Sequence, residues 1–178
     1  METRLKIRIY GDPCLRRTSV DVNEVGSAER ILINCMLDTM YRQEGIGLAA
    51  PQVGINQNIL VGDIGDGPFV MVNPKVLEET GSGMMEEGCL SLPGVNVVVS
   101  RPTKIVVRFM DESNKMFERE FSELMARVIL HEMDHLKGKL ICDYADQEQK
   151  ARIEAILSRL ERNVVPSKEK YGNARRFI

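Results

Sequence analysis

The stretch SELMARVILHEMDHLKG, residues 122–138, decides how the rest of the chain is interpreted. Its apolar residues recur at the three- and four-residue spacing of an amphipathic helix. The only two histidines of the chain, His131 and His135, both lie in it. Residues four apart project from the same face of a helix, so the two imidazoles can bind one metal ion while Glu132 lies beside an open coordination position. The stretch therefore predicts a helix that carries part of a catalytic metal site.

Two further helices and several strands are expected on either side of this helix. Apolar periodicity predicts a helix over residues 27–43 with Ser27 as its N-cap, and another over residues 146–163 that Asp146 caps. Helices and strands are grouped rather than alternating, which indicates one α+β domain with mostly antiparallel strands between an N-terminal helix and the two later helices. Period-two or apolar runs place strands at 5–10, 58–64, 69–74, 95–100 and 104–111, with a hairpin partner at 116–121.

The bulk composition limits the class of protein. A chain of 178 residues suits a single domain, assigned to residues 1–163, and the basic segment 164–178 is expected to form a mobile tail. The net charge of −2 argues against direct nucleic-acid binding, and no apolar run approaches the roughly 20 residues that span a bilayer. The N-terminus resembles no export signal, and the four cysteines form no CxxC pair. We therefore expect a cytoplasmic protein with free thiols.

The predicted helix supplies two metal ligands and leaves the identity of the third open. A catalytic site of the zinc type keeps three protein ligands and one open position. The longer pattern HExxHxxGxxH would need a histidine where this chain has Ile141, so the third ligand is a thiolate or a carboxylate. Glu148 and Glu154 lie on a predicted helix, where a charged residue is by default a solvated surface group. Cys89, in the segment MEEGCLSLPG, is the better candidate, although a cysteine taken alone is more often a core thiol.

Three motifs together give the chain a family resemblance. GIGLAAPQ at residues 45–52, EGCLS at residues 87–91 and HEMDH at residues 131–135 occur in this order. The chain in this respect closely resembles the peptide deformylase family, over roughly residues 5–160. Three intact motifs in order are far more specific than any one of them.

The resemblance implies an activity and a set of metal ligands. Members of this family are hydrolases that remove the formyl group from the N-terminal formyl-methionine of newly made polypeptides and release formate, an N-terminal processing step of protein biosynthesis. The implied ligands of one divalent metal ion are Cys89, His131 and His135. Iron(II) is the usual metal of the family, and zinc, nickel or cobalt can occupy the site; a thiolate with two imidazoles suits all of them. Glu87 is expected to steady the surroundings of the metal, through Arg101.

The resemblance also implies the catalytic groups. The metal lowers the pKa of its bound water, Glu132 accepts the proton and passes it to the departing amine, and attack on the formyl carbon produces an oxyanion. The implied donors to this oxyanion are the side-chain amide of Gln52 and the backbone N–H of Leu90. The loss of one such donor typically costs on the order of 2.7–4 kcal/mol of transition-state stabilisation.

The substrate is expected to lie along the glycine-containing motif. The resemblance places Ile46 and Gly47 beside the peptide, with Ile46 and Val128 at the pocket for the methionine side chain. Arg127 departs from the family pattern, which usually has apolar residues on that wall. An arginine at the pocket mouth would either bias the choice of substrate or extend its charge to solvent.

Two other functions compete with deformylation. The first is an HExxH metallopeptidase whose third ligand is a carboxylate, and the second is a non-catalytic homologue with a structural metal. Glu132 and Gln52 weigh against the second, because a purely structural site would not need them. The expected partner is a formyl-methionyl nascent peptide, and the basic tail suggests the ribosome as a second partner; no membrane is expected.

Overall fold

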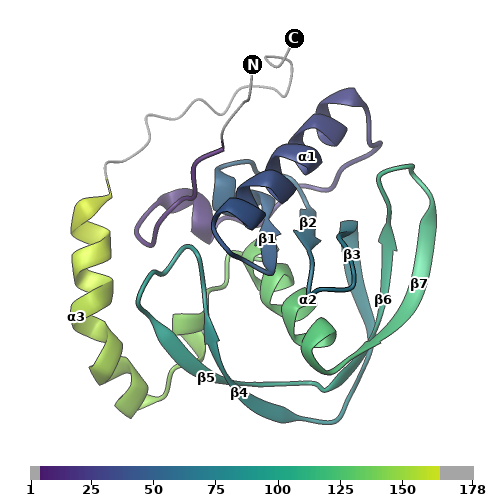
Figure 1. The fold of residues 1–178 in the computed structure, drawn as a ribbon. Coiled ribbons are helices and arrows are strands. Elements are labelled where there is room, and N and C mark those ends of the chain that lie inside the picture. The colour runs from purple at the N-terminus through teal and green to yellow at the C-terminus, as the bar shows by residue number, and fades with distance from the viewer. Residues whose placement is uncertain (1–4, 165–178) are drawn as a thin grey trace.

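The computed structural model describes residues 5–164. Five strands form an antiparallel sheet in the order β1-β2-β3-β6-β7, and two strands pair separately as an antiparallel ribbon, β4–β5 (Figure 1). With its separate helices, this is the α+β domain that the sequence predicts. The strands are β1 (Gly47–Ala49), β2 (Ile59–Gly62), β3 (Phe69–Thr80), β4 (Gly83–Gly88), β5 (Asn96–Arg101), β6 (Lys104–Met110) and β7 (Met116–Ser122).

The two faces of the five-stranded sheet are covered by different helices. Helix α1 packs on one face and helix α2 on the other, while the β4–β5 ribbon and helix α3 lie outside the sheet (Figure 1). Within residues 5–164, no helix combines the length and the apolarity needed to cross a membrane. The α-helices are α1 (Ser27–Arg42), α2 (Glu123–Leu136) and α3 (Gln147–Asn163), and three short 3-10 turns are η1 (Pro13–Arg16), η2 (Ala50–Val53) and η3 (Ile141–Tyr144).

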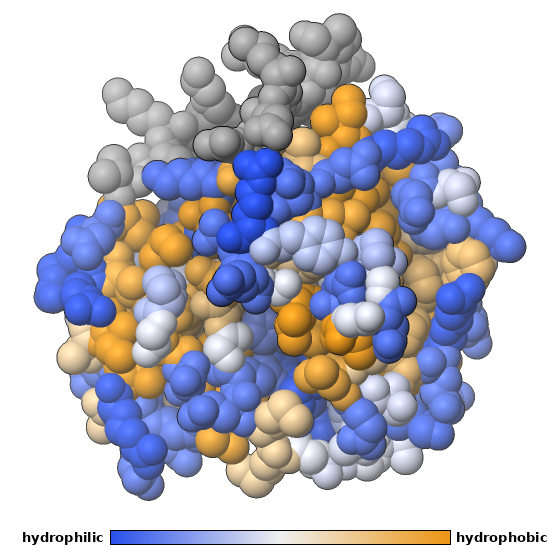
Figure 2. All heavy atoms as spheres, viewed as in Figure 1, coloured by the Kyte–Doolittle hydropathy of each residue, from blue (hydrophilic) through white to orange (hydrophobic). Residues whose placement is uncertain are grey.

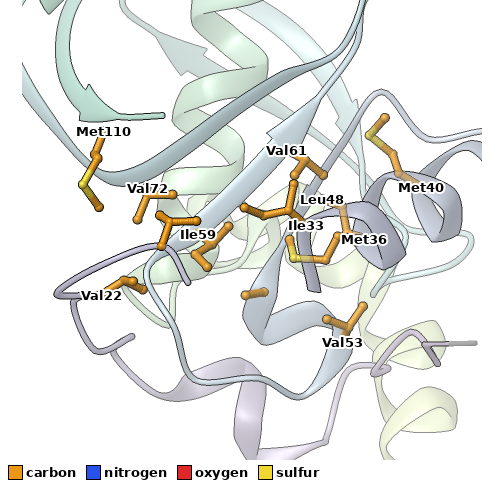
Figure 3. Packing of buried hydrophobic residues seen from close by; sticks show 12 residues of the cluster. Val22, Ile33, Met36, Met40, Leu48, Val53, Ile59, Val61, Val72 and Met110 are labelled. Carbon is orange, nitrogen blue, oxygen red and sulfur yellow. The ribbon is translucent and has the colours of Figure 1, made fainter. Parts of the chain in front are cut away.

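Side-chain alternation along the strands creates the two cores on either side of the sheet. In β2, Ile59 and Val61 point to the α1 side, where they pack with Met36, and Leu60 points to the α2 side. Figure 3 shows the first of these cores, with methionines from α1 against valines and isoleucines of the sheet. The second core packs Ile129 and its neighbours of α2 against the opposite face. Helix α2 is therefore packed on the sheet in the same core as Ala49 of the edge strand β1.

A third core joins the ribbon to the C-terminal helix. The inward residues of β5 pack against the η1 and η3 turns and against Ile153 of α3. In Figure 2 the outer flank of α3, at the left edge, is blue, and the flank toward the rest of the molecule is orange. Helix α3 thus covers the ribbon, and the tail predicted at 164–178 lies outside the described residues except for its first one.

Asp146 and Gly138 lie at helix ends that suit them, whereas the N-cap expected for α1 is displaced, and Ser122 is the N-cap of α2 without a capping bond from its side chain. Asp146 caps α3, since its side chain accepts a hydrogen bond from Gln149 N. Gly138 has a φ of 71° just after α2, a conformation that favours glycine. The expected cap of α1 at Ser27 is wrong by one residue: Gly26 occupies the N-cap, and the Glu29 carboxylate accepts its N–H.

Three strand assignments differ from the expectation. Residues 5–10 form no strand, because their backbone pairs with two separate loops rather than with one partner strand. Arg8 N donates to Gln52 O at 2.7 Å and Tyr10 N donates to Ser91 O at 2.8 Å, so this segment joins two of the three motifs. The sequence reading missed β1 and β4, whose glycines and glutamates are atypical of strands.

Candidate metal centre

Three side chains from two separate parts of the fold meet at one point. Cys89 directly follows β4 of the ribbon, and His131 and His135 project from α2. One ligand atom from each lies within 4.8 Å of the other two, and the Cys89 Sγ is 3.3 Å from His135 Nε2. Within residues 5–164 this is the one group of at least three acidic, histidine or cysteine side chains with such geometry. The structure brings together the three residues that the sequence assigned as ligands.

A buried carboxylate fixes the orientation of the first histidine. Glu87 Oε2 lies 3.0 Å from His131 Nδ1, and the carboxylate is also bonded by Arg101 at 2.6 and 2.9 Å. Burial opposes its charge, but the hydrogen bonds from His131 and Arg101 outweigh burial and lower the pKa of Glu87 to about 2. Glu87 therefore stays ionised and holds the His131 ring so that its other nitrogen faces the cluster. The expected contact between Glu87 and Arg101 is present.

The two histidines have different electrostatic surroundings. Burial disfavours the charge of His131, yet hydrogen bonds with Cys89 and Glu87 outweigh this effect and raise its pKa to about 10. Burial and the neighbouring His131 lower the pKa of His135, which is 1% exposed. A neutral His135 presents a lone pair for coordination.

Glu132 lies next to the cluster and is almost fully buried. Its side chain is 3% exposed, and burial raises the pKa of its carboxyl group to about 7. The Cβ of any larger residue at Gly47 would collide with Glu132 Oε1, so the carboxylate lies directly against the edge strand β1. A carboxyl group with this pKa can accept and return a proton near neutral pH.

Gln52 connects the first motif to the second. Its Oε1 accepts a hydrogen bond from Ala49 N at 2.8 Å, which fixes the amide so that Nε2 points toward Ser91 Oγ at 3.3 Å and Cys89 Sγ at 3.6 Å. The Leu90 side chain lies against Gly45 of the first motif, since a Cβ at Gly45 would collide with it. Leu90 and Ser91 form a turn directly after Cys89.

Two of the three predicted substrate residues, Ile46 and Gly47, lie at the edge of the sheet, and the third, Val128, lies on α2. β1 is the terminal strand of the five-stranded sheet and pairs with β2 on one side only. Ile46, just before it, is 47% exposed, and its carbonyl is held by Asp63 N at 3.0 Å. Val128 is buried on α2, three residues before His131 and on the same helix face. An edge with exposed backbone beside a metal cluster can pair with an extended peptide.

Arg127 does not occupy the position expected for it. It is 8% exposed, so it neither extends to solvent nor lies free at a pocket mouth. Instead its Nη1 donates to Glu87 Oε1 at 2.7 Å and to Val99 O at 3.1 Å, and its Nη2 donates to Gly83 O at 2.6 Å. The difference arises because residues distant in sequence provide three acceptors that make burial of the guanidinium favourable.

The sequence reading also missed Asp134, the acidic residue inside HEMDH. Its Oδ2 accepts hydrogen bonds from Arg101 Nη1 at 2.9 Å and from the Tyr144 hydroxyl at 2.7 Å. One arginine therefore joins Glu87 on the ribbon to Asp134 on the helix. An acidic residue within a mostly apolar helix was the available signal, because such a residue needs a partner when it is buried.

The carboxylate alternative for the third ligand finds no support in the positions of Glu148 and Glu154. Both residues lie on exposed positions of α3, and the Glu148 side chain is 77% exposed and pairs with Arg152. Neither joins the Cys89 cluster.

The donor set fits a divalent metal. A thiolate and two imidazole nitrogens are suitable ligands for zinc, iron(II) and related ions, and three such ligands leave a position open. Among the described side chains, Glu132 Oε2 is buried without a hydrogen-bond partner, as a base directed at a reacting group would be.

Comparison with known proteins relates most of the chain to one family. Residues 4–151 match the family model described as Polypeptide deformylase. A peptide deformylase from Clostridium botulinum is 49% identical over 137 residues, covering 77% of this chain and 93% of the relative. The crystal structure of a peptide deformylase from Legionella pneumophila superposes with a TM-score of 0.84 at 36% identity, covering 90% and 96% of the two chains. That of the Thermotoga maritima enzyme gives 0.79 at 40% identity, covering 80% and 98%.

Proposed function

The chain belongs to the polypeptide deformylase family, and from this premise we propose how its own residues perform the reaction. It is a metal-dependent enzyme that removes the N-formyl group from newly made polypeptides and releases formate. The proposal assigns Cys89, His131 and His135 as the ligands of the divalent metal. The observation that carries it is the convergence of these three side chains within 4.8 Å, beside a buried glutamate and an edge strand.

Glu132 is proposed as the general base and acid. A divalent metal held by the three ligands would lower the pKa of water and so make a hydroxide nucleophile accessible near neutral pH. Glu132, whose own pKa is raised to about 7 by burial, accepts the proton of that water and then donates it to the amine that leaves. Its position against Gly47 keeps it close to a peptide paired with β1.

Gln52 and Leu90 are proposed to stabilise the negative charge that develops on the formyl oxygen. The Gln52 side chain is 1% exposed, and its bond from Ala49 N presents the NH₂ group toward the cysteine loop. The backbone N–H of Leu90 directly follows the ligand Cys89. Donors held in advance by other hydrogen bonds need little reorganisation when the charge appears, which makes them effective.

The substrate is proposed to bind as an added strand. Ile46 and Gly47 provide backbone groups at the open edge of β1, and Val128 lies on the helix face that leads to His131. We propose that the methionine side chain of the formyl-methionyl peptide lies between Ile46 and Val128. The physiological metal is proposed to be iron(II), with zinc, nickel or cobalt as substitutes, because the ligand set accepts all four.

A formate-release assay combined with metal analysis tests the proposed function. The purified protein should contain about one metal ion per chain and release formate from a formyl-methionyl tripeptide, and a chelator should abolish the release. An HExxH metallopeptidase would instead cleave unformylated peptides internally, and a structural metal protein would do neither. Internal cleavage without formate release would overturn the proposal.

Gly47→Ala tests the contact between the edge strand and the base. The new methyl group would overlap Glu132 Oε1, and the strand cannot retreat because β2 pairs with it. We expect kcat/KM for the formyl peptide to fall by about 10²-fold, the effect of a displacement of about 1 Å in a catalytic group, while the metal content is unchanged. Gly26→Ala is the control for a glycine substitution, because Gly26 has an ordinary φ of −90° at the start of α1 and a Cβ there meets only the flexible Glu29 carboxylate, at 3.2 Å. Wild-type kinetics in Gly47→Ala would contradict the assigned position of Glu132.

The C-terminal segment is proposed to be a separate functional part of the protein. We propose that residues 1–163 form the catalytic domain and that 164–178, with its basic residues, contacts the ribosome in the cytoplasm. Deletion of 164–178 is expected to reduce co-sedimentation with ribosomes and to leave the release of formate from a short peptide unchanged. Unchanged co-sedimentation would remove this part of the proposal.

A further inference from the structure

We propose that Arg127 is a positioning residue of the metal centre, an inference that rests on the function proposed above. Cys89 comes from the β4–β5 ribbon, whereas both histidines come from α2. The ribbon is not hydrogen-bonded into the five-stranded sheet that α2 packs against. The distance between the thiolate and the imidazoles therefore depends on the bonds that hold the ribbon to the helix. Arg127 makes three of these bonds, beside the Arg101–Asp134 and Glu87–His131 contacts.

Arg127 bonds both strands of the ribbon from a single position on the helix. Its Nη2 donates to the carbonyl of Gly83, the first residue of β4, at 2.6 Å. Its Nη1 donates to the carbonyl of Val99 in β5 at 3.1 Å. Gly83 and Val99 lie two residues apart in the ladder, since Gly83 pairs with Arg101. One guanidinium thus fixes both the separation and the register of the ribbon relative to α2.

The third bond of Arg127 links it to Glu87, the carboxylate that orients His131. Its Nη1 also donates to Glu87 Oε1 at 2.7 Å, while His131 Nδ1 lies against the other oxygen, Oε2. Arg101 bonds both oxygens of the same carboxylate. Loss of Arg127 would therefore leave Glu87 paired with Arg101 and His131. The contribution specific to Arg127 is its pair of bonds to the carbonyls of Gly83 and Val99, which help to place both strands of the ribbon, and hence Cys89.

The chemistry of the guanidinium explains why arginine suits this position. Arg127 precedes His131 by four residues, so both side chains leave the same face of α2 and reach the same part of the ribbon. A planar group with five donors can bond two carbonyls and a carboxylate together, whereas a lysine ammonium acts as a point charge. At 8% exposure, the charge is stable because the ionised Glu87 lies next to it.

Cobalt binding to the full-length protein tests the proposal. Metal-free wild type and Arg127→Met would be titrated with Co²⁺, and the thiolate-to-cobalt absorption would be recorded. We expect Arg127→Met to bind Co²⁺ about 10- to 100-fold more weakly, the range typical for residues that orient ligands, with a weaker thiolate band. Arg127→Lys keeps the charge but cannot bond both strands, so we expect an intermediate affinity.

A matched control separates positioning from general stability. Ile129→Val alters the same helix on the face that packs against the sheet, away from the ribbon. It should lower Tm and leave the affinity for Co²⁺ and the thiolate band unchanged. Wild-type Co²⁺ affinity in Arg127→Met, or in Arg127→Lys if the methionine variant does not fold, would overturn the proposal. Formate release by the wild type tests the proposed function separately, since it does not depend on either variant.

Discussion

Cys89→Ala is expected to lose its metal ion and, with it, measurable deformylation. The alanine leaves only two imidazoles, which are too few for a stable site of this kind. Metal affinity should fall by more than about 100-fold, beyond the range typical for residues that only orient ligands. Metal content after dialysis, measured together with formate release from a formyl-methionyl peptide, gives the result.

Cys142→Ala is the matched control for this substitution. Cys142 is also a free cysteine, and it belongs to the same apolar cluster against which Cys89 packs. Burial raises the pKa of its thiol, so it remains protonated and unsuited to bind a metal. The control should keep both its metal and its activity. A Cys89→Ala protein that retained one metal ion per chain would favour a carboxylate ligand and the metallopeptidase alternative.

Glu132→Gln is expected to keep the metal but to lose most of its turnover. The amide has the shape of the carboxylate and cannot accept the proton of the attacking water. A general base of this kind contributes about 10²- to 10⁴-fold to the rate, so kcat should fall by that factor. Because burial already disfavours the ionised form of Glu132, we expect no loss of thermal stability.

The control for Glu132→Gln is the same change at a surface glutamate. Glu148→Gln removes an exposed charge on α3 that is not part of the metal cluster, and it should leave kcat unchanged. Metal analysis of both variants shows whether the site is intact. Deformylation at the wild-type rate by metal-loaded Glu132→Gln protein would refute the assignment of this residue as the base.

The three proposed metal ligands could be selected from the sequence because their geometry is mostly local. A helix fixes the relation between His131 and His135, and the scarcity of histidine leaves few candidates for a third ligand. The motif EGCLS then pointed to Cys89, which the structure places in the cluster. Helices α2 and α3 were also predictable, since apolar periodicity and capping residues lie within each segment.

The features that were mispredicted depend on contacts between residues distant in sequence. The sequence predicts Arg127 at a pocket mouth, because the carbonyls of Gly83 and Val99 that it bonds lie far from it in the sequence. Strand β4 contains two glutamates and becomes a strand only by pairing with β5. Residues 5–10 alternate like a strand, but their backbone bonds go to Gln52 and Ser91, in two different loops. Local propensity cannot anticipate these outcomes.

The open edge of β1 brings a hazard as well as a binding surface. An unpaired strand edge can pair with a strand of any other protein, which is a common route to aggregation. Here the edge strand is only three residues long and begins with Gly47, so a foreign strand gains few hydrogen bonds from it. The same shortness limits how strongly backbone pairing alone can retain a peptide. An enzyme with so short an edge strand can release each substrate peptide readily, and the same short strand protects it from aggregation.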